Sequence, residues 1–189
     1  DDNLLSQCHD LKIISNVAVG YNNIDIEACT RRKIMVTNTP GILDETTADF
    51  TWTLLLATAR RVVEADQYLR SLKWKRWGLM DFLGYDIHHK VLGICGLGRI
   101  GRCVARRAKG FDMQILYTDV SRVHPSIEEG LGASFVDKKT LLAESDFVTL
   151  HVPLLPETTH YISTDEFSLM KHTSCLLYTS PSPRDRTRS

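Results

Sequence analysis

The stretch that decides the fold is Val91–Gly110, "VLGICGLGRIGRCVARRAKG". It opens with an apolar run, Val91–Cys95, that suits a buried strand, and the glycines Gly96, Gly98 and Gly101 follow before a helical pattern begins. In such a turn the first glycine adopts the sharp bend, the second leaves room for a phosphate, and the third lets the helix lie close to the strand. The N–H groups and dipole at the helix start then favour a pyrophosphate.

An acidic residue follows at the spacing that a dinucleotide site requires. The next apolar run ends at Thr118, and Asp119 lies 18 positions after Gly101. A carboxylate there accepts both hydroxyls of an adenosine ribose and repels a 2′-phosphate, which favours NAD over NADP. Arg122 could pair with such a phosphate, so NADP stays an alternative. The alternative is a glycine turn that binds no ligand. It is disfavoured because the strand, the three glycines, the helix and the acidic residue all occur at the spacing of a dinucleotide-binding unit.

The bulk composition is that of a globular protein. The chain has 189 residues, 43% of them hydrophobic, and 23 basic and 23 acidic side chains. This neutral balance gives no general attraction to nucleic acid or anionic lipid, and no apolar run reaches membrane-spanning length, so we expect neither partner. Five cysteines without a C-x-x-C pair indicate reduced thiols of a cytoplasmic protein, and no metal site is predicted.

Runs that suit strands alternate with runs that suit helices from Val91 onward. The predicted strands are Val91–Cys95, Gln114–Thr118, Ser134–Asp137 and Asp146–His151, with one more after His172. The predicted helices are Arg99–Gly110, which glycine ends, a stretch reaching Gly132, Lys139–Glu144 and Thr164–Met170. This alternation is typical of an α/β fold, with a parallel sheet wound on both faces by helices.

A separate unit precedes this alternation. It contains strands at Leu11–Ser15 and Ile34–Thr37 and a short helix within Ile24–Arg32. A long helix over about residues 47–72 divides the two units, with Thr46 and Asp49 as its expected capping box. Its apolar stripe is expected to comprise Phe50, Leu54, Ala57, Val62, Ala65 and Leu69.

Four segments resemble the D-isomer-specific 2-hydroxyacid dehydrogenases, and within them the glyoxylate/hydroxypyruvate reductase branch. They are "NVAVGYNNIDIEAC", "IMVTNTPGILDETTADFTWTLLLATARRVVEAD", "FLGYDIHHKVLGICGLGRIGRCVARRAKGFDMQILYTD" and "ESDFVTLHVPLLPETTHYI". The resemblance implies a Rossmann-type nucleotide domain and a flavodoxin-like substrate domain, with the active site between them. Residues 1–45 would be the C-terminal part of the substrate domain. Residues 46–174 would be the NAD-binding domain, with the interdomain helix at about 47–72.

The resemblance also implies site residues. Val19 and Gly20 would offer backbone N–H groups to a substrate carboxylate, where a plain strand-to-loop turn is the alternative. The implied cofactor-binding residues are Thr47 near the nicotinamide, Gly96, Leu97, Gly98, Arg99, Ile100 and Gly101 along the pyrophosphate, Asp119, Val120 and Ser121 around the ribose, and His151, Val152 and Pro153 against the adenosine. Thr47 could equally cap its helix. His151 is assigned no acid–base role.

The implied chemistry is hydride transfer between NAD(H), or NADP(H), and a small 2-keto or 2-hydroxy acid. The family's catalytic Arg, Glu and His would follow His172, where this chain reads "LLYTSPSPRD", so no catalytic residue is assigned. The stretch "CLLYTSPSPRD" resembles an in-frame sequencing adapter, and we expect residues 175–189 to be non-native and the chain to be an inactive fragment.

Three further expectations complete this interpretation. The resemblance implies a homodimer for the parent protein. Within the enzyme class, a phosphoglycerate-type or another D-2-hydroxyacid dehydrogenase is an alternative. Outside it, an NAD(H)-sensing corepressor of the same fold is a second alternative, although "NTPGILDETTAD" and "FLGYD" favour the metabolic branch.

Overall fold

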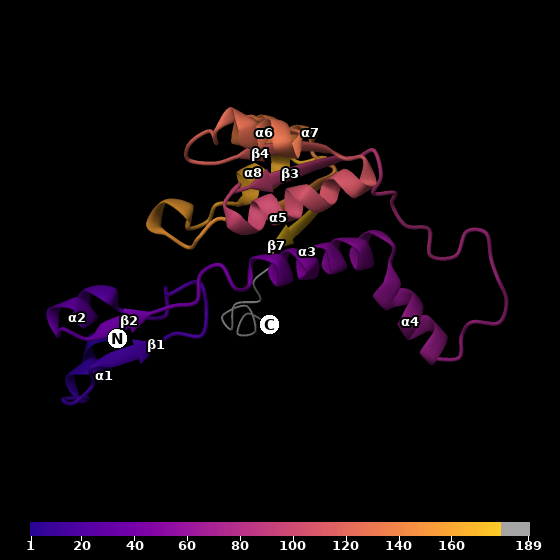
Figure 1. The fold of residues 1–189 in the computed structure, drawn as a ribbon. Helices are drawn as coiled ribbons and strands as arrows, with labels where there is room; N and C mark the ends of the chain where they lie inside the picture. The colour runs from indigo at the N-terminus through magenta and orange to yellow at the C-terminus, as the bar shows by residue number, and fades with distance from the viewer. Residues whose placement is uncertain (179–189) are drawn as a thin grey trace.

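A computed structural model describes residues 1–178, which form a small N-terminal unit and a larger sheet-containing unit linked through helix α3 (Figure 1). The helices are α1 (Asp2–Ser6), α2 (Ile26–Arg31), α3 (Asp44–Ala59), α4 (Val62–Arg70), α5 (Arg99–Ala108), α6 (Pro125–Leu131), α7 (Lys138–Glu144) and α8 (Thr164–Leu169). The strands are β1 (Ile13–Ser15), β2 (Met35–Thr37), β3 (Val91–Cys95), β4 (Gln114–Thr118), β5 (Ala133–Phe135), β6 (Phe147–Leu150) and β7 (Cys175–Tyr178). Short 3-10 turns occupy η1 (Lys109–Phe111) and η2 (Pro156–Thr158).

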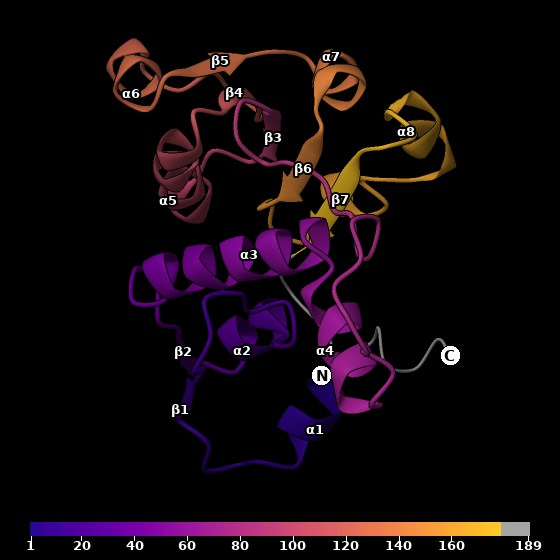
Figure 2. The same ribbon diagram turned by 90° about the vertical axis from the view of Figure 1, so that its right-hand side faces the viewer.

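The larger unit is built on a parallel sheet. Within the described residues its strand order is β5-β4-β3-β6-β7, and each neighbouring pair is parallel. Helices α3 and α5 cover one face, and α7 and α8 lie on the other (Figure 2). The chain winds outward from β3 first to one side and then to the other, so the expected α/β, Rossmann-type doubly wound sheet is confirmed.

Helix α3 belongs to the core of the larger unit although a long connector separates it from β3. The indole Nε1 of Trp52 donates a hydrogen bond to the Val104 carbonyl oxygen at 3.1 Å. The same ring stacks on Phe111, with centroids 4.8 Å apart and planes 8° from parallel. On the surface, Glu45 pairs with Arg106 and Arg107 of α5 at 3.0 and 2.8 Å. These contacts hold α3 against α5.

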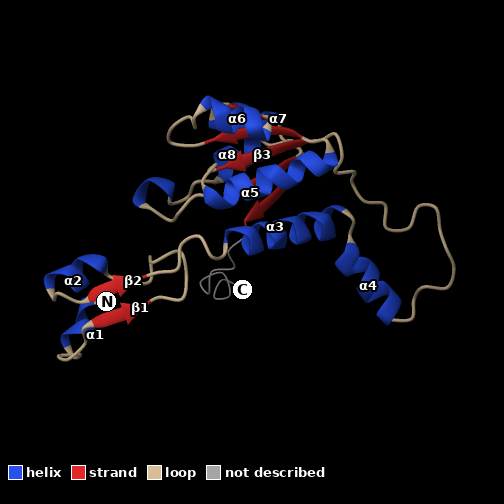
Figure 3. Ribbon diagram, viewed as in Figure 1, coloured by secondary structure: helices blue, strands red, loops and turns tan. Residues whose placement is uncertain are grey.

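The N-terminal unit is a small strand–helix–strand layer. Strands β1 and β2 are parallel, and α1 and α2 lie beside them (Figure 3). The Asp25 carboxylate caps α2 by accepting the Ala28 N–H at 2.9 Å. The expected elements are therefore present here, each shorter than the sequence pattern indicated.

The expected single helix over residues 47–72 is wrong. The structure has two helices, because Arg61 between them adopts φ +53°, a left-handed conformation that ends α3. Helix α3 also begins at Asp44, and Leu43 is its N-cap without a side-chain cap, so Thr46 and Asp49 form no capping box. The helix starts earlier than the polar residues suggested.

The predicted apolar stripe lies only partly on the buried side of α3, where Leu54 packs against the core. The buried residues of α3 include Ala48, Trp52, Leu55 and Ala59, whereas Phe50 is 47% exposed. Both faces of α3 carry apolar side chains, so helical periodicity alone did not identify the buried one. Packing against α5 selects the face that bears Trp52.

Several helices and strands of the larger unit begin or end at other residues than predicted. Helix α5 stops at Ala108 and tightens into η1, and Asp112 at φ +50°, not Gly110, adopts the left-handed conformation. The expected strand at Ser134–Asp137 lies at Ala133–Phe135. The strand expected after His172 is β7, which pairs with β6.

The division into 1–45, 46–174 and 175–189 stays a prediction. Four residues of the last segment form β7, and the remaining ones, 179–189, lie outside the described residues. That residues 175–189 are non-native also stays a prediction.

Trp52→Phe should lower the free energy of unfolding by about 1–2 kcal/mol, because the Val104 carbonyl loses a buried donor and the stack on Phe111 loses area. Urea unfolding followed by circular dichroism at 222 nm measures this. The control is Trp77→Phe, whose ring is 75% exposed and which should change stability by less than about 0.5 kcal/mol. Equal losses in the two variants would mean that Trp52 does not hold α3 in place.

Candidate functional site

The turn after β3 has the geometry expected of a dinucleotide-binding loop. Gly96 has φ +92°, and its N–H donates to the Thr118 carbonyl oxygen at 2.8 Å. A Cβ on Gly96 would lie 2.9 Å from the His151 carbonyl oxygen. Glycine is therefore required here on two grounds, the backbone conformation and the approach of the segment after β6.

The other two glycines differ sharply in their surroundings. A Cβ added to Gly98 would meet nothing within 4 Å, so the space before the N-terminus of α5 is open. A Cβ added to Gly101 would overlap the Gly96 carbonyl oxygen, because the helix lies directly on the turn. The predicted geometric roles of the three glycines, which are turn, open approach and close packing, are confirmed.

The start of α5 offers backbone donors rather than side-chain caps. Gly98 is the N-cap residue, and no side chain in the described part of the chain caps this end. The Leu97 side chain is fully buried, so only its backbone can face a ligand. Arg99 is exposed and Ile100 partly buried in the first turn. A helix of this kind attracts an anion through its N–H groups and its dipole.

The Asp119 carboxylate lies beside this turn, at the tip of β4. Its Oδ2 accepts the Leu97 N–H at 2.8 Å, and its Oδ1 accepts the Val120 N–H at 2.8 Å. The spacing of acid and glycines in the sequence thus corresponds to direct contact in space. Val120 is fully exposed and Ser121 is exposed, so both lie on the open side of this tip.

A cavity of about 860 Å³ lies between the two units, next to the glycine turn. It gathers predicted residues from separate parts of the chain: Val19, Gly20, Thr47, Ile100, His151, Val152 and Pro153. The rest of its lining is mainly apolar and includes Tyr161 and Ile162, which the sequence reasoning missed. Gly96, Leu97, Gly98, Arg99, Gly101, Asp119, Val120 and Ser121 are not part of this lining.

The structure shows the surroundings of Thr47 and His151, two residues of the cavity lining. Thr47 lies inside the first turn of α3 and donates its N–H to the Leu43 carbonyl oxygen at 2.8 Å, so the alternative role of helix cap is wrong. Burial lowers the pKa of His151 to about 4, and its Nε2 lies 3.0 Å from Thr149 Oγ1. His151 is therefore neutral at pH 7.

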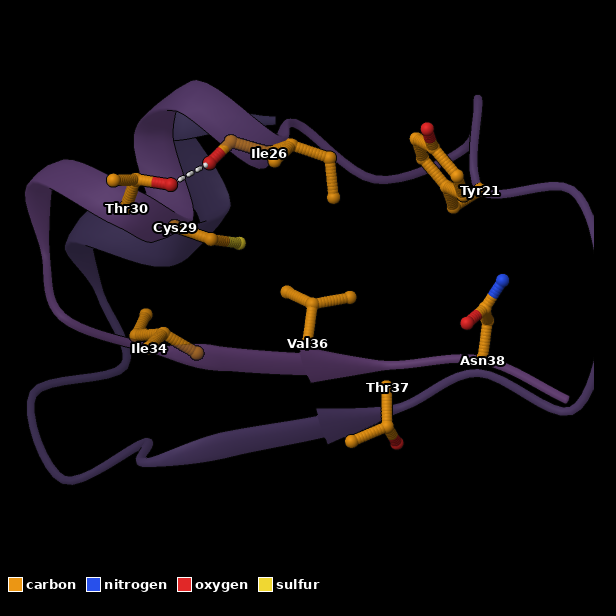
Figure 4. A pocket seen from close by; sticks show the side chains of 8 residues that line it. All are labelled: Tyr21, Ile26, Cys29, Thr30, Ile34, Val36, Thr37 and Asn38. Atoms are coloured by element: carbon orange, nitrogen blue, oxygen red, sulfur yellow. Dashed lines mark hydrogen bonds between the residues drawn. The ribbon is translucent and has the colours of Figure 1, made fainter.

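A second cavity, of about 350 Å³, lies within the N-terminal unit (Figure 4). Cys29 of α2 and Val36 of β2 point into it, and Tyr21 and Asn38 stand at its other end (Figure 4). None of the predicted site residues lines it. The larger cavity does gather predicted site residues, so that cavity and the glycine turn are the better candidate site.

Two other classes of site find no support in residues 1–178. These residues contain no group of three or more His, Cys, Asp or Glu side chains that could hold a metal ion. No helix in this same range is long and apolar enough to cross a membrane.

Comparison with known proteins identifies the family. Residues 52–182 match the model of the D-isomer specific 2-hydroxyacid dehydrogenase, NAD binding domain. Glyoxylate reductase of Thermococcus litoralis is 53% identical over 184 residues, which cover 95% of this chain and 55% of that protein. The chain spans about half the length of the curated relatives it matches.

Solved structures agree in fold. The TT0316 protein from Thermus thermophilus superposes with a TM-score of 0.87 at 40% identity, over 95% of this chain and 56% of that one. D-lactate dehydrogenase from Aquifex aeolicus, complexed with NAD and lactic acid, gives 0.84 at 32% identity, over 95% and 53%. The coenzyme of this domain is NAD(P), and the chain belongs to the D-isomer specific 2-hydroxyacid dehydrogenase family.

Proposed function

We propose that this chain forms the coenzyme-binding part of a reductase that converts glyoxylate or hydroxypyruvate to glycolate or D-glycerate with NADH. The single observation that carries the proposal is the contact between Asp119 and the Leu97 N–H, because it puts the ribose-binding acid against the pyrophosphate-binding turn. The relatives named glyoxylate reductase support this choice of substrate.

The coenzyme end of the site rests on α5 and β4. The open approach at Gly98 and the N–H groups of the first turn of α5 would hold the pyrophosphate. Asp119, Val120 and Ser121 would surround the adenosine ribose. The Asp119 carboxylate accepts the Leu97 and Val120 N–H groups, and it would exchange the Leu97 N–H for ribose hydroxyls.

The substrate end rests on the loop after β1. Asn38 Nδ2 donates to the Val19 carbonyl oxygen at 2.9 Å, and Asn16 Nδ2 donates to the Gly20 carbonyl oxygen at 2.8 Å. The first of these bonds holds the peptide unit that carries the Gly20 N–H. The Thr39 N–H, which donates to the Ala18 carbonyl oxygen at 3.1 Å, holds the unit that carries the Val19 N–H. In the described part of the chain neither Val19 N–H nor Gly20 N–H has a protein acceptor, and both could bind a substrate carboxylate.

The cavity between these ends suits the hydride-transfer step. When bound, a reduced nicotinamide would supply the hydride, and the cavity lining beside it is mostly apolar. Thr47 and Ile100 also line the cavity. His151, Val152 and Pro153 would pack on the adenosine, with His151 as a neutral ring.

The homodimer of the parent protein is supported by an exposed apolar arm, which we define as α4 with residues 71–85. Figure 3 shows this arm projecting away from the sheet. Leu72, Trp74, Trp77 and Met80 are each more than half exposed. A second copy of the chain would cover this surface, and sedimentation equilibrium tests for it. A cytoplasmic location also stays a prediction.

Asp119→Ser tests the observation that carries the proposal. The unaltered chain should bind NADH more tightly than NADPH. The variant should lose about tenfold in NADH affinity, because the charge-assisted hydrogen bond to the ribose is lost. Its NADPH affinity should rise, because the smaller neutral side chain no longer repels the 2′-phosphate. Titration followed by coenzyme fluorescence measures both constants. Asp86→Ser, at the other end of β3, should change neither, and unchanged affinities in Asp119→Ser would remove this carboxylate from the site.

Gly98→Val separates binding from folding. A Cβ at this position meets no atom within 4 Å, so the midpoint of thermal unfolding should be nearly unchanged. NADH affinity should fall by at least about tenfold, because Cβ and its methyl groups would block the phosphate. Gly130→Val, at another open glycine on α6, is the matched control and should bind normally. Normal binding by Gly98→Val would place the pyrophosphate elsewhere.

His151 should titrate near pH 4 in a proton NMR series, because burial disfavours its charged form. Since the folded-state pKa lies below the unfolded value of about 6.5, neutral His151 contributes stability above pH 6.5 that is lost as pH falls toward 4. His151→Gln should flatten this part of the stability–pH curve. A His151 pKa above 6 would contradict the burial.

A further inference from the structure

Three side chains form a cluster directly behind the tip of β4. Tyr117 in β4 is fully buried, and its hydroxyl donates to Glu128 Oε1 in α6 at 2.6 Å. Arg122, in the loop between these elements, donates from Nε to Glu128 Oε1 at 2.9 Å and from Nη2 to Oε2 at 2.8 Å. The Val123 N–H donates to the Tyr117 hydroxyl oxygen at 3.0 Å.

The geometry makes Glu128 a strong anchor for Arg122. Both carboxylate oxygens accept from one guanidinium, which is the two-pronged arrangement that holds arginine most firmly. Only 10% of the Glu128 side chain is exposed, against 63% of Arg122. Hydrogen bonds from Arg122 and then Tyr117 lower the pKa of Glu128 to about 2, so the carboxylate is ionised at neutral pH.

The cluster lies where coenzyme selectivity is determined. Arg122 is three residues beyond Asp119, on the loop that leaves β4 next to the glycine turn. A 2′-phosphate differs from a 2′-hydroxyl by close to two negative charges, and an arginine fork is well suited to bind it. Two of the donors of that fork are committed to Glu128.

We propose that Glu128 is a positioning residue for coenzyme selectivity: it holds Arg122 away from the ribose 2′ position and so favours NAD(H) over NADP(H). The inference rests on the proposed function, because it needs the adenosine ribose at Asp119. The carboxylates of Asp119 and Glu128 would then both favour NAD(H) over NADP(H). Asp119 repels the phosphate, and Glu128 withholds the cation that would attract it.

The main experiment uses the Asp119→Ser chain, in which a phosphate can approach. Adding Glu128→Gln, which keeps an acceptor for the Tyr117 hydroxyl, should tighten NADPH binding by at least about threefold and leave NADH binding nearly unchanged. Adding Arg122→Ala to that double variant should abolish the gain. The matched control is Glu129→Gln, an identical charge change at the neighbouring exposed residue of α6, which should give no gain.

The outcomes are read from the NADPH-to-NADH affinity ratio, because a purely structural role of Glu128 would weaken both coenzymes together. An unchanged ratio in Asp119→Ser/Glu128→Gln, or a gain that survives Arg122→Ala, overturns the inference. Failure of the unaltered chain to bind either coenzyme overturns the proposed function instead.

A second measurement covers the case in which Glu128→Gln does not fold. Arg122→Ala in the otherwise unaltered chain removes an exposed side chain and leaves Glu128 bonded to Tyr117. The NADPH-to-NADH ratio should stay the same, since Arg122 is already withheld from the coenzyme. A selective loss of NADPH affinity would show that Arg122 reaches the phosphate despite Glu128, and the inference would fail.

Discussion

The close contact between the start of α5 and the turn after β3 is the constraint on which the rest of this structure depends. Gly101 lies on the Gly96 carbonyl, and Gly96 in turn lies against the His151 backbone. A side chain at either glycine would push α5 off the sheet or separate β3 from β6. The same contact that packs the helix therefore also aims its N–H groups at the crevice where the strand order reverses.

Helix α3 extends this arrangement to the N-terminal unit. Trp52 anchors its middle to α5, and Glu45 pairs with two arginines of α5 near its start. The first turn of α3 consequently lies at the cavity, and Thr47 is part of its lining together with Gly20 and Ile100. The loop after β1 and Ile100 of α5 border one cavity, and α3, which packs against α5, joins the two units.

The region around the tip of β4 contains two carboxylates with different partners. Asp119 accepts the Leu97 and Val120 N–H groups, while Glu128 of α6 accepts the guanidinium of Arg122. The sequence shows an arginine three residues after Asp119, but its pairing with a carboxylate six residues further on, in a different element, is seen only in the tertiary structure.

The sequence by itself determined the strand, the glycine turn, α5 and Asp119, because local backbone requirements and a fixed spacing specify them. It could not determine which face of α3 is buried, since both carry apolar residues and only packing against α5 selects Trp52 over Phe50. It could not place the break at Arg61, whose left-handed conformation no local pattern signals. The pairing of Glu128 with Tyr117 likewise required the tertiary structure, because only folding brings α6 onto β4 and desolvates that carboxylate.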